Sequence, residues 1–135
     1  MRTRPRSTVA LGGAVVVIVV SWAGLALMGG GDGDRARASG VVAGVCETLE
    51  VSSNGGDARR PFFDQAHDDL HTLAADVTEV DRGVAARLLR AKERVESALA
   101  AEFPEEQRTA MIQTLADATQ EAARVIDPST EAGCS

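Results

Sequence analysis

An uncharged, apolar run occupies residues 9–28, near the start of the 135-residue chain. A helix rises about 1.5 Å per residue, so about 20 residues are needed to cross the hydrocarbon core of a bilayer, which is about 30 Å thick. The run has this length, and glycine and charged residues follow it. The pattern therefore predicts one transmembrane helix at residues 9–28, with the lipid bilayer as its partner.

The charges on either side of this run predict its orientation. Three arginines precede it within residues 1–8, and the flank that follows is acidic. Because positively charged flanks stay on the cytoplasmic side, we expect residues 1–8 to be a cytoplasmic tail. The remainder of the chain is then expected outside the cell membrane, in a periplasm or in the extracellular space. A cleaved signal peptide is the alternative, with Ala36-Arg37-Ala38 as a candidate cleavage site, although its apolar stretch is usually only about 7–15 residues long.

Beyond the run, residues 29–40 combine glycines with charges and lack large apolar side chains, which is typical of a flexible linker. Four stretches with apolar residues every three to four positions follow, and this spacing predicts amphipathic helices. Their apolar positions are Val42, Val45, Cys46 and Leu49; then Phe63, Ala66, Leu70, Leu73, Val77 and Val80; then Val84, Leu88, Ala91, Val95 and Leu99; and finally Met111, Leu115, Ala118, Ala122 and Val125.

Helix-start and helix-stop residues separate these four stretches. The cluster at residues 52–56 ends the first, Pro61 and Pro104 can each begin a helix, and Asp127-Pro128 stops the last. The step at residues 81–83 either caps a new helix or only kinks a longer one. No strand-like alternation competes with this pattern. We therefore expect an all-α fold in which residues 41–135 form an antiparallel bundle of three to four helices.

Charge narrows the classes of partner. The chain has 20 acidic residues against 14 lysines and arginines, and all the acidic residues follow residue 31. Such a domain is repelled by phosphate backbones, so nucleic acid is excluded as a partner. A protein partner or a second copy of the chain remains compatible with this charge.

The two cysteines are expected to form a disulfide. Cys46 lies in the first predicted helix and Cys134 follows the last, so both fall toward one end of an up-down bundle. An even pair in a small domain outside the cytoplasm is usually bridged. An intermolecular bridge or a redox pair is the alternative, although no C-x-x-C spacing supports exchange chemistry.

One segment, DQAHDDLH, carries candidate metal chemistry. Asp64, His67, Asp68 and His71 stand at offsets of 0, 3, 4 and 7, which places them on one helix face. Two imidazoles four residues apart can chelate a transition metal, and carboxylates could complete a site for zinc, iron or copper. The alternatives are an ordinary polar boundary of the bundle with local ion pairs, or a pH-responsive contact.

No catalytic motif accompanies these features. The chain lacks G-x-S-x-G, a phosphate-binding loop, H-E-x-x-H and tyrosine, while Glu93 and Glu96 interleave with arginines as a solvated salt-bridge face would. The function most compatible with the sequence is a membrane-anchored, non-enzymatic interaction or envelope accessory module, for which no cofactor is expected. Extracytoplasmic metal binding or sensing through the histidine face is the alternative.

Overall fold

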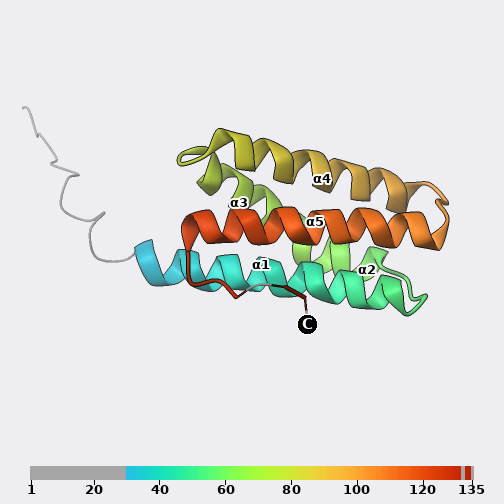
Figure 1. Cartoon of the computed structure of the whole chain (residues 1–135). Coiled ribbons are helices and arrows are strands. Elements are labelled where there is room, and N and C mark those ends of the chain that lie inside the picture. Colours follow the sequence, from blue (N-terminus) through green and yellow to red (C-terminus); the bar gives the residue numbers. More distant parts are fainter. Residues whose placement is uncertain (1–29, 132, 135) are drawn as a thin grey trace, which may run out of the picture.

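The computed structural model describes residues 30–131, 133 and 134, and every regular element within them is helical. Four helices form an antiparallel bundle, as predicted (Figure 1). The elements are α1 (Gly30–Ser53), α2 (Arg59–Pro61), the π-helical turn η2 (Phe62–Ala66), α3 (His67–Thr78), α4 (Arg82–Ala100) and α5 (Glu105–Ile126). Because α2, η2 and α3 follow one another without a break, they make up the second of the four helices.

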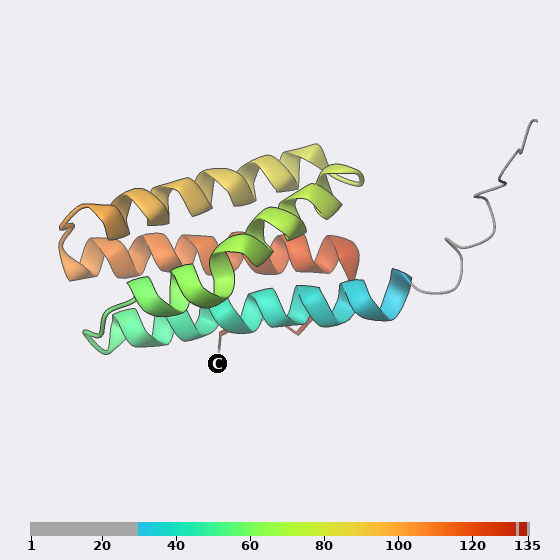
Figure 2. The same ribbon diagram turned by 180° about the vertical axis from the view of Figure 1, so that it is seen from behind.

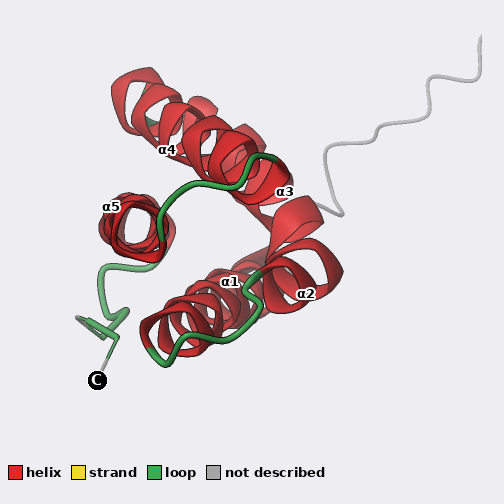
Figure 3. Cartoon of the chain, turned by 90° about the vertical axis from the view of Figure 1, so that its right-hand side faces the viewer, coloured by secondary structure: helices red, strands yellow, loops and turns green. Residues whose placement is uncertain are grey.

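The last helix occupies the centre of one side of the bundle. Helix α5 packs against both α1 and α4, while α3 packs against α4 and η2 packs against α1. Viewed from the end, α5 lies between α1 and α4, and the second helix closes the opposite side (Figure 3). The view from behind shows this second helix crossing from α1 toward α4 as it passes from α2 to α3 (Figure 2).

The first helix begins earlier than predicted, because residues 30–40 are helical rather than a flexible linker. Tertiary contacts explain the difference: Ala38 is only 1% exposed, and two arginines of this stretch form ion pairs with other parts of the bundle. Arg37 contacts Asp76 of α3 at 3.5 Å, and Arg35 contacts Asp127 at 4.0 Å. These contacts outweigh the low helix propensity of the glycines. Within the described residues, α1 therefore includes residues 30–40.

A π-helical turn shifts the buried face at the start of the second helix. The predicted stripe included Phe63, but the buried ring is Phe62, which is fully enclosed, while Phe63 is 45% exposed. A π-turn inserts one residue into the helical register, so positions before it lie on a different face from the one that α-helical spacing predicts. After the turn the prediction is confirmed through Val77, whereas Val80 lies beyond the helix and is exposed.

Helix α4, the third of the four helices, begins where it was predicted and buries the residues that were predicted. The Asp81 carboxylate accepts hydrogen bonds from the backbone N–H groups of Gly83 and Val84 at 2.9 and 3.0 Å, which satisfies two of the unpaired donors of α4. This cap makes the step at residues 81–83 a helix start and not a kink. All five apolar positions predicted for this helix are buried.

The buried faces of α1 and α5 are rotated relative to the predicted stripes. Met111, Ala118 and Val125 of α5 are only half-buried, as are Val42 and Cys46 of α1. The core positions of α5 include Ile112, Leu115, Ala116, Thr119, Ala122 and Ala123, and those of α1 include Val41, Val45, Thr48 and Leu49. Helix α5 contacts α1, α4 and α3, so its buried face is broader than one stripe.

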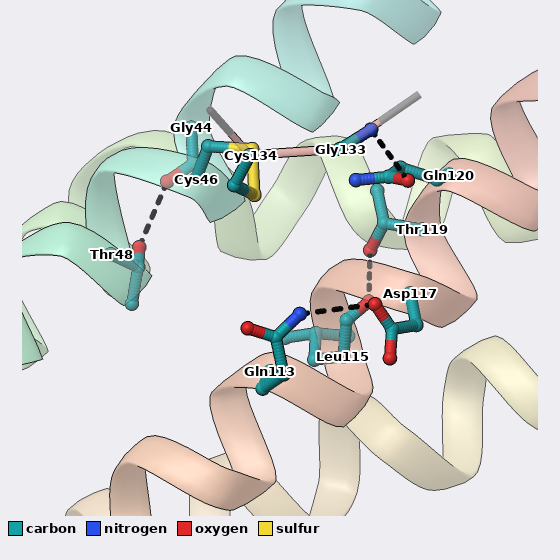
Figure 4. The surroundings of a disulfide bond; sticks show 10 residues. All are labelled: Gly44, Cys46, Thr48, Gln113, Leu115, Asp117, Thr119, Gln120, Gly133 and Cys134. Carbon is teal, nitrogen blue, oxygen red and sulfur yellow. Dashed lines mark hydrogen bonds between the residues drawn. A yellow bond between two sulfur atoms is a disulfide. The ribbon is translucent and has the colours of Figure 1, made fainter. Parts of the chain in front are cut away.

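Cys46 and Cys134 form a disulfide with a Cα–Cα distance of 5.2 Å, as predicted, although they meet for a different reason. The chain after α5 turns back along α1 (Figure 1), and this path brings Cys134 to Cys46. The Ser129 hydroxyl and backbone N–H donate to Asp127, which stabilises this reversal and lowers the pKa of Asp127. Further along, the Gly133 N–H donates to the Gln120 side chain beside the disulfide (Figure 4).

The predictions for the N-terminal segment are not tested by this structure. The cytoplasmic tail at residues 1–8 and the transmembrane helix at residues 9–28 both lie outside the described residues. Within the described part of the chain, every helix is too short or too polar to cross a membrane.

Removing the disulfide should destabilise the bundle. It closes a loop with a sequence separation of 88 residues, and constraining a loop of this length in the unfolded chain stabilises the fold by about 4 kcal/mol in the chain-entropy model. The double variant Cys46→Ser/Cys134→Ser should lose that amount, as measured by urea unfolding followed by circular dichroism. An unchanged unfolding midpoint would show that the bond constrains nothing.

Removing the cap of α4 should have a smaller effect. Asp81→Ala leaves two N–H groups without a partner and should lower the free energy of unfolding by about 1 kcal/mol. Asp81→Asn keeps an acceptor in the same place and is the matched control, which should lose much less. Equal losses for the two variants would contradict a capping role.

Candidate functional site

The two histidines lie one helical turn apart at the start of α3, immediately after the π-turn. Their rings contact edge to face, with centroids 5.3 Å apart. His71 is exposed, whereas His67 is half-buried and packs against the rings of Phe62 and Phe63. The structure therefore confirms that one helix face presents both imidazoles together.

Glu96 of α4 completes the cluster from the neighbouring helix. Its Oε1 lies 2.6 Å from Nε2 of His67. One ligand atom from each of His67, His71 and Glu96 can be chosen so that all three lie within 4.8 Å of one another. Glu96 was predicted on a solvated salt-bridge face with the arginines, and this was wrong, because it pairs with the buried Lys92. The missed signal was the turn at residues 81–82: His67 and Glu96 are equally far from it, so an antiparallel α3–α4 pair brings them side by side.

The partner of Glu96 on its own helix is Lys92. The lysine side chain is 2% exposed, and its ammonium lies 2.5 Å from Oε1 of Glu96. Burial raises the pKa of Glu96. The hydrogen bonds and charges of Lys92 and His67 together lower it by more than burial raises it, so the pKa of Glu96 lies below its ordinary value. The carboxylate is thus held in its charged form, which is the form that binds cations.

The two aspartates that were predicted as ligands have other roles. Asp64 lies on the π-turn, where it is exposed and pairs with Arg60 at 3.8 Å, so it does not join the cluster. The predicted offsets assumed regular α-helical spacing, and the π-turn breaks that spacing between Asp64 and His67. Asp68 is also outside the cluster, but its Oδ1 lies 2.9 Å from Nδ1 of His67. It is therefore placed to orient the imidazole.

Both nitrogens of His67 face carboxylate oxygens, and this arrangement favours a cation. A neutral imidazole has one N–H and can donate to only one of two carboxylates. If that N–H is Nδ1–H donating to Asp68, the lone pair of Nε2 points toward Glu96. A zinc ion bound to both side chains would require their 2.6 Å contact to open, because two ligand atoms of one tetrahedral zinc ion lie about 3.3 Å apart. A carboxylate that holds the far nitrogen of a metal-binding histidine in this way is common in zinc sites. The cluster thus offers two imidazole nitrogens, one carboxylate oxygen and an outer carboxylate.

This ligand set suits a borderline metal ion better than a hard one. Imidazole favours zinc, copper, iron and nickel, whereas calcium and magnesium prefer sites made of oxygen alone. Two histidines and one carboxylate are a known zinc-binding combination, in which a fourth position stays open to water or another ligand. The exposure of His71 leaves such a position accessible from solvent.

Comparisons with protein-family models, with curated proteins and with solved structures found no match for this chain. Function therefore has to be inferred from the geometry and chemistry of the site itself.

Neutralising Glu96 should destabilise the bundle, because the buried ammonium of Lys92 would lose its counter-ion. Breaking a fully buried pair costs about 3–5 kcal/mol, and since the Glu96 side chain is 30% exposed we expect Glu96→Gln to lose about 2 kcal/mol. Glu93→Gln removes an exposed carboxylate from the same helix and should change stability by less than about 0.5 kcal/mol. Urea unfolding of the two variants makes the comparison, and indistinguishable midpoints would contradict the proposed pairing.

Proposed function

We propose that this chain is a membrane-anchored, extracytoplasmic helical module that binds a divalent transition metal, best represented by Zn²⁺, through His67, His71 and Glu96. The observation that carries the proposal is the position of Glu96, which α4 brings to the two imidazoles of α3 within 4.8 Å. Two helices must pack in one register to create this arrangement.

Three further features support the metal site. Oδ1 of Asp68 lies 2.9 Å from Nδ1 of His67 and would accept its N–H when a metal ion binds Nε2. The phenylalanine rings beside His67 provide an apolar wall, which strengthens electrostatic interactions at the site. In addition, the π-turn lies directly before His67, and π-turns within helices occur frequently at functional sites.

The anchored and extracytoplasmic part of the proposal rests on different features. The uncharged run at residues 9–28 has the length of a membrane span, and the arginines before it favour a cytoplasmic N-terminus. A disulfide between Cys46 and Cys134 persists in an oxidising compartment, which favours a location outside the cytoplasm.

A second candidate function is protein interaction, and one surface favours it. Adjoining hollows of about 360 and 430 Å³ lie along the groove between α4 and α5. Met111 and Arg94 line both of them. Apolar side chains flanked by arginine are enriched in protein interfaces, so this groove is where a partner protein would bind.

Zinc binding can be tested on the full-length protein in detergent after removal of metal by a chelator. We expect one Zn²⁺ per chain by titration against a chromophoric chelator, and His71→Ala should weaken the affinity by more than about tenfold. Asp68→Asn should also weaken it, by about tenfold, because outer carboxylates typically contribute 10- to 100-fold to affinity.

Asp64→Asn is the matched control, since it removes a carboxylate from the same segment without touching the cluster. Its affinity for zinc should equal that of the unaltered protein. The proposal fails if the unaltered protein binds no zinc, or if Asp64→Asn weakens binding as much as His71→Ala does.

A further inference from the structure

The Glu96 oxygen that faces His67 is already occupied by a cation of the protein itself. Oε1 of Glu96 lies 2.5 Å from the Lys92 ammonium and 2.6 Å from Nε2 of His67. A metal ion bound to both Glu96 and His67 would enter the space in which these three groups now meet. Lys92 is therefore the group that incoming metal must displace.

We infer that metal uptake at this centre is an exchange of cations, in which the metal ion replaces the Lys92 ammonium on Glu96 and the ammonium moves out to solvent. This inference rests on the proposed metal site. A divalent ion and the Lys92 ammonium would compete for Oε1 of Glu96, and their charges repel each other in this partly buried environment. The carboxylate keeps its charge throughout, and only its counter-ion changes.

The surroundings of Lys92 allow this movement. Its side chain is 2% exposed, but Glu96 beside it is 30% exposed, so the ammonium lies only a short way below the surface. Lysine has a flexible four-carbon stem that can stay packed against apolar neighbours while its charged end reaches water. The exchange therefore requires a change of side-chain rotamer and no movement of the helix.

The exchange also specifies what happens to the two ring nitrogens of His67. Coordination uses the lone pair of Nε2, so any proton on that nitrogen passes to solvent, while Nδ1–H remains hydrogen-bonded to Asp68. The metal thus enters as the ammonium is released, and the imidazole keeps its orientation. Lys92 acts as a built-in competitor that lowers the affinity for metal and keeps the empty site electrostatically neutralised.

Chemical labelling of Lys92 tests this exchange directly, because it is the sole lysine of the chain. The full-length protein is treated with formaldehyde and a borohydride reductant, with and without Zn²⁺, and methylation of the Lys92 peptide is followed by mass spectrometry. We expect slow labelling without metal and a several-fold faster rate with zinc. His71→Ala, which should bind zinc more than about tenfold more weakly, should show a much smaller acceleration at the same zinc concentration.

A substitution gives a second, independent readout. Lys92→Met keeps an unbranched chain of similar length in the core and removes the competing charge, so zinc affinity should rise by about tenfold or more. Arg90→Met is the matched control, since it removes one positive charge from the exposed face of the same helix. Its zinc affinity should change much less.

The outcomes separate this inference from the proposed function. If zinc binds the unaltered protein while Lys92 stays protected, and Lys92→Met binds zinc no more tightly than Arg90→Met, the exchange is wrong and the metal site stands. If neither the unaltered protein nor Lys92→Met binds zinc, the metal site fails and the exchange with it. Should Lys92→Met not fold, the labelling rates of the unaltered protein still decide the question.

Discussion

A buried ammonium must have a counter-ion, and in this bundle the carboxylate that pairs with the Lys92 ammonium also links two helices. Lys92 is almost fully enclosed on α4, and its partner Glu96 stands one turn further along the same helix. The carboxylate in turn contacts His67, which ties α4 to the start of α3. An isolated buried charge is strongly unfavourable, so slippage of α3 against α4 would disturb the whole Lys92–Glu96–His67 network. The position of the candidate metal site follows from this constraint.

The rest of the bundle is held together by modest contributions. Much of the core consists of alanine and valine, and Phe62 is the largest fully buried side chain among the described residues. Two buried threonines are satisfied within their own helices, because the Thr48 and Thr119 hydroxyls donate to backbone carbonyls one turn earlier. A small domain with so little apolar bulk gains from a covalent constraint. The disulfide supplies it by fastening the chain end across the middle of α1.

The sequence predicted the regular parts of this fold and missed the features that depend on contacts between distant residues. The stripe from Val84 to Leu99 and the cap at Asp81 were confirmed, because local periodicity and capping chemistry determine them. The prediction that Phe63 is buried was wrong, because Phe62 is the buried ring. Nothing in the local spacing signals the π-turn that causes this change. Residues 30–40 were assigned to a linker because their composition is glycine-rich, whereas in the structure they are helical and Ala38 is buried in the core. Glu96 was missed because it is far from the histidines in sequence, and because the step at residues 81–83 was compatible with either a new helix or a kink.

The proposed metal centre consists of two imidazoles from α3 and one carboxylate from α4. X-ray absorption at the zinc K-edge of the full-length protein, loaded with one equivalent of Zn²⁺, measures this coordination directly. The account predicts two imidazole nitrogens at about 2.0–2.1 Å and a carboxylate oxygen at about 2.0–2.2 Å, with the outer scattering typical of histidine rings. A first shell made of oxygen alone, or one that contains a single imidazole, would contradict it.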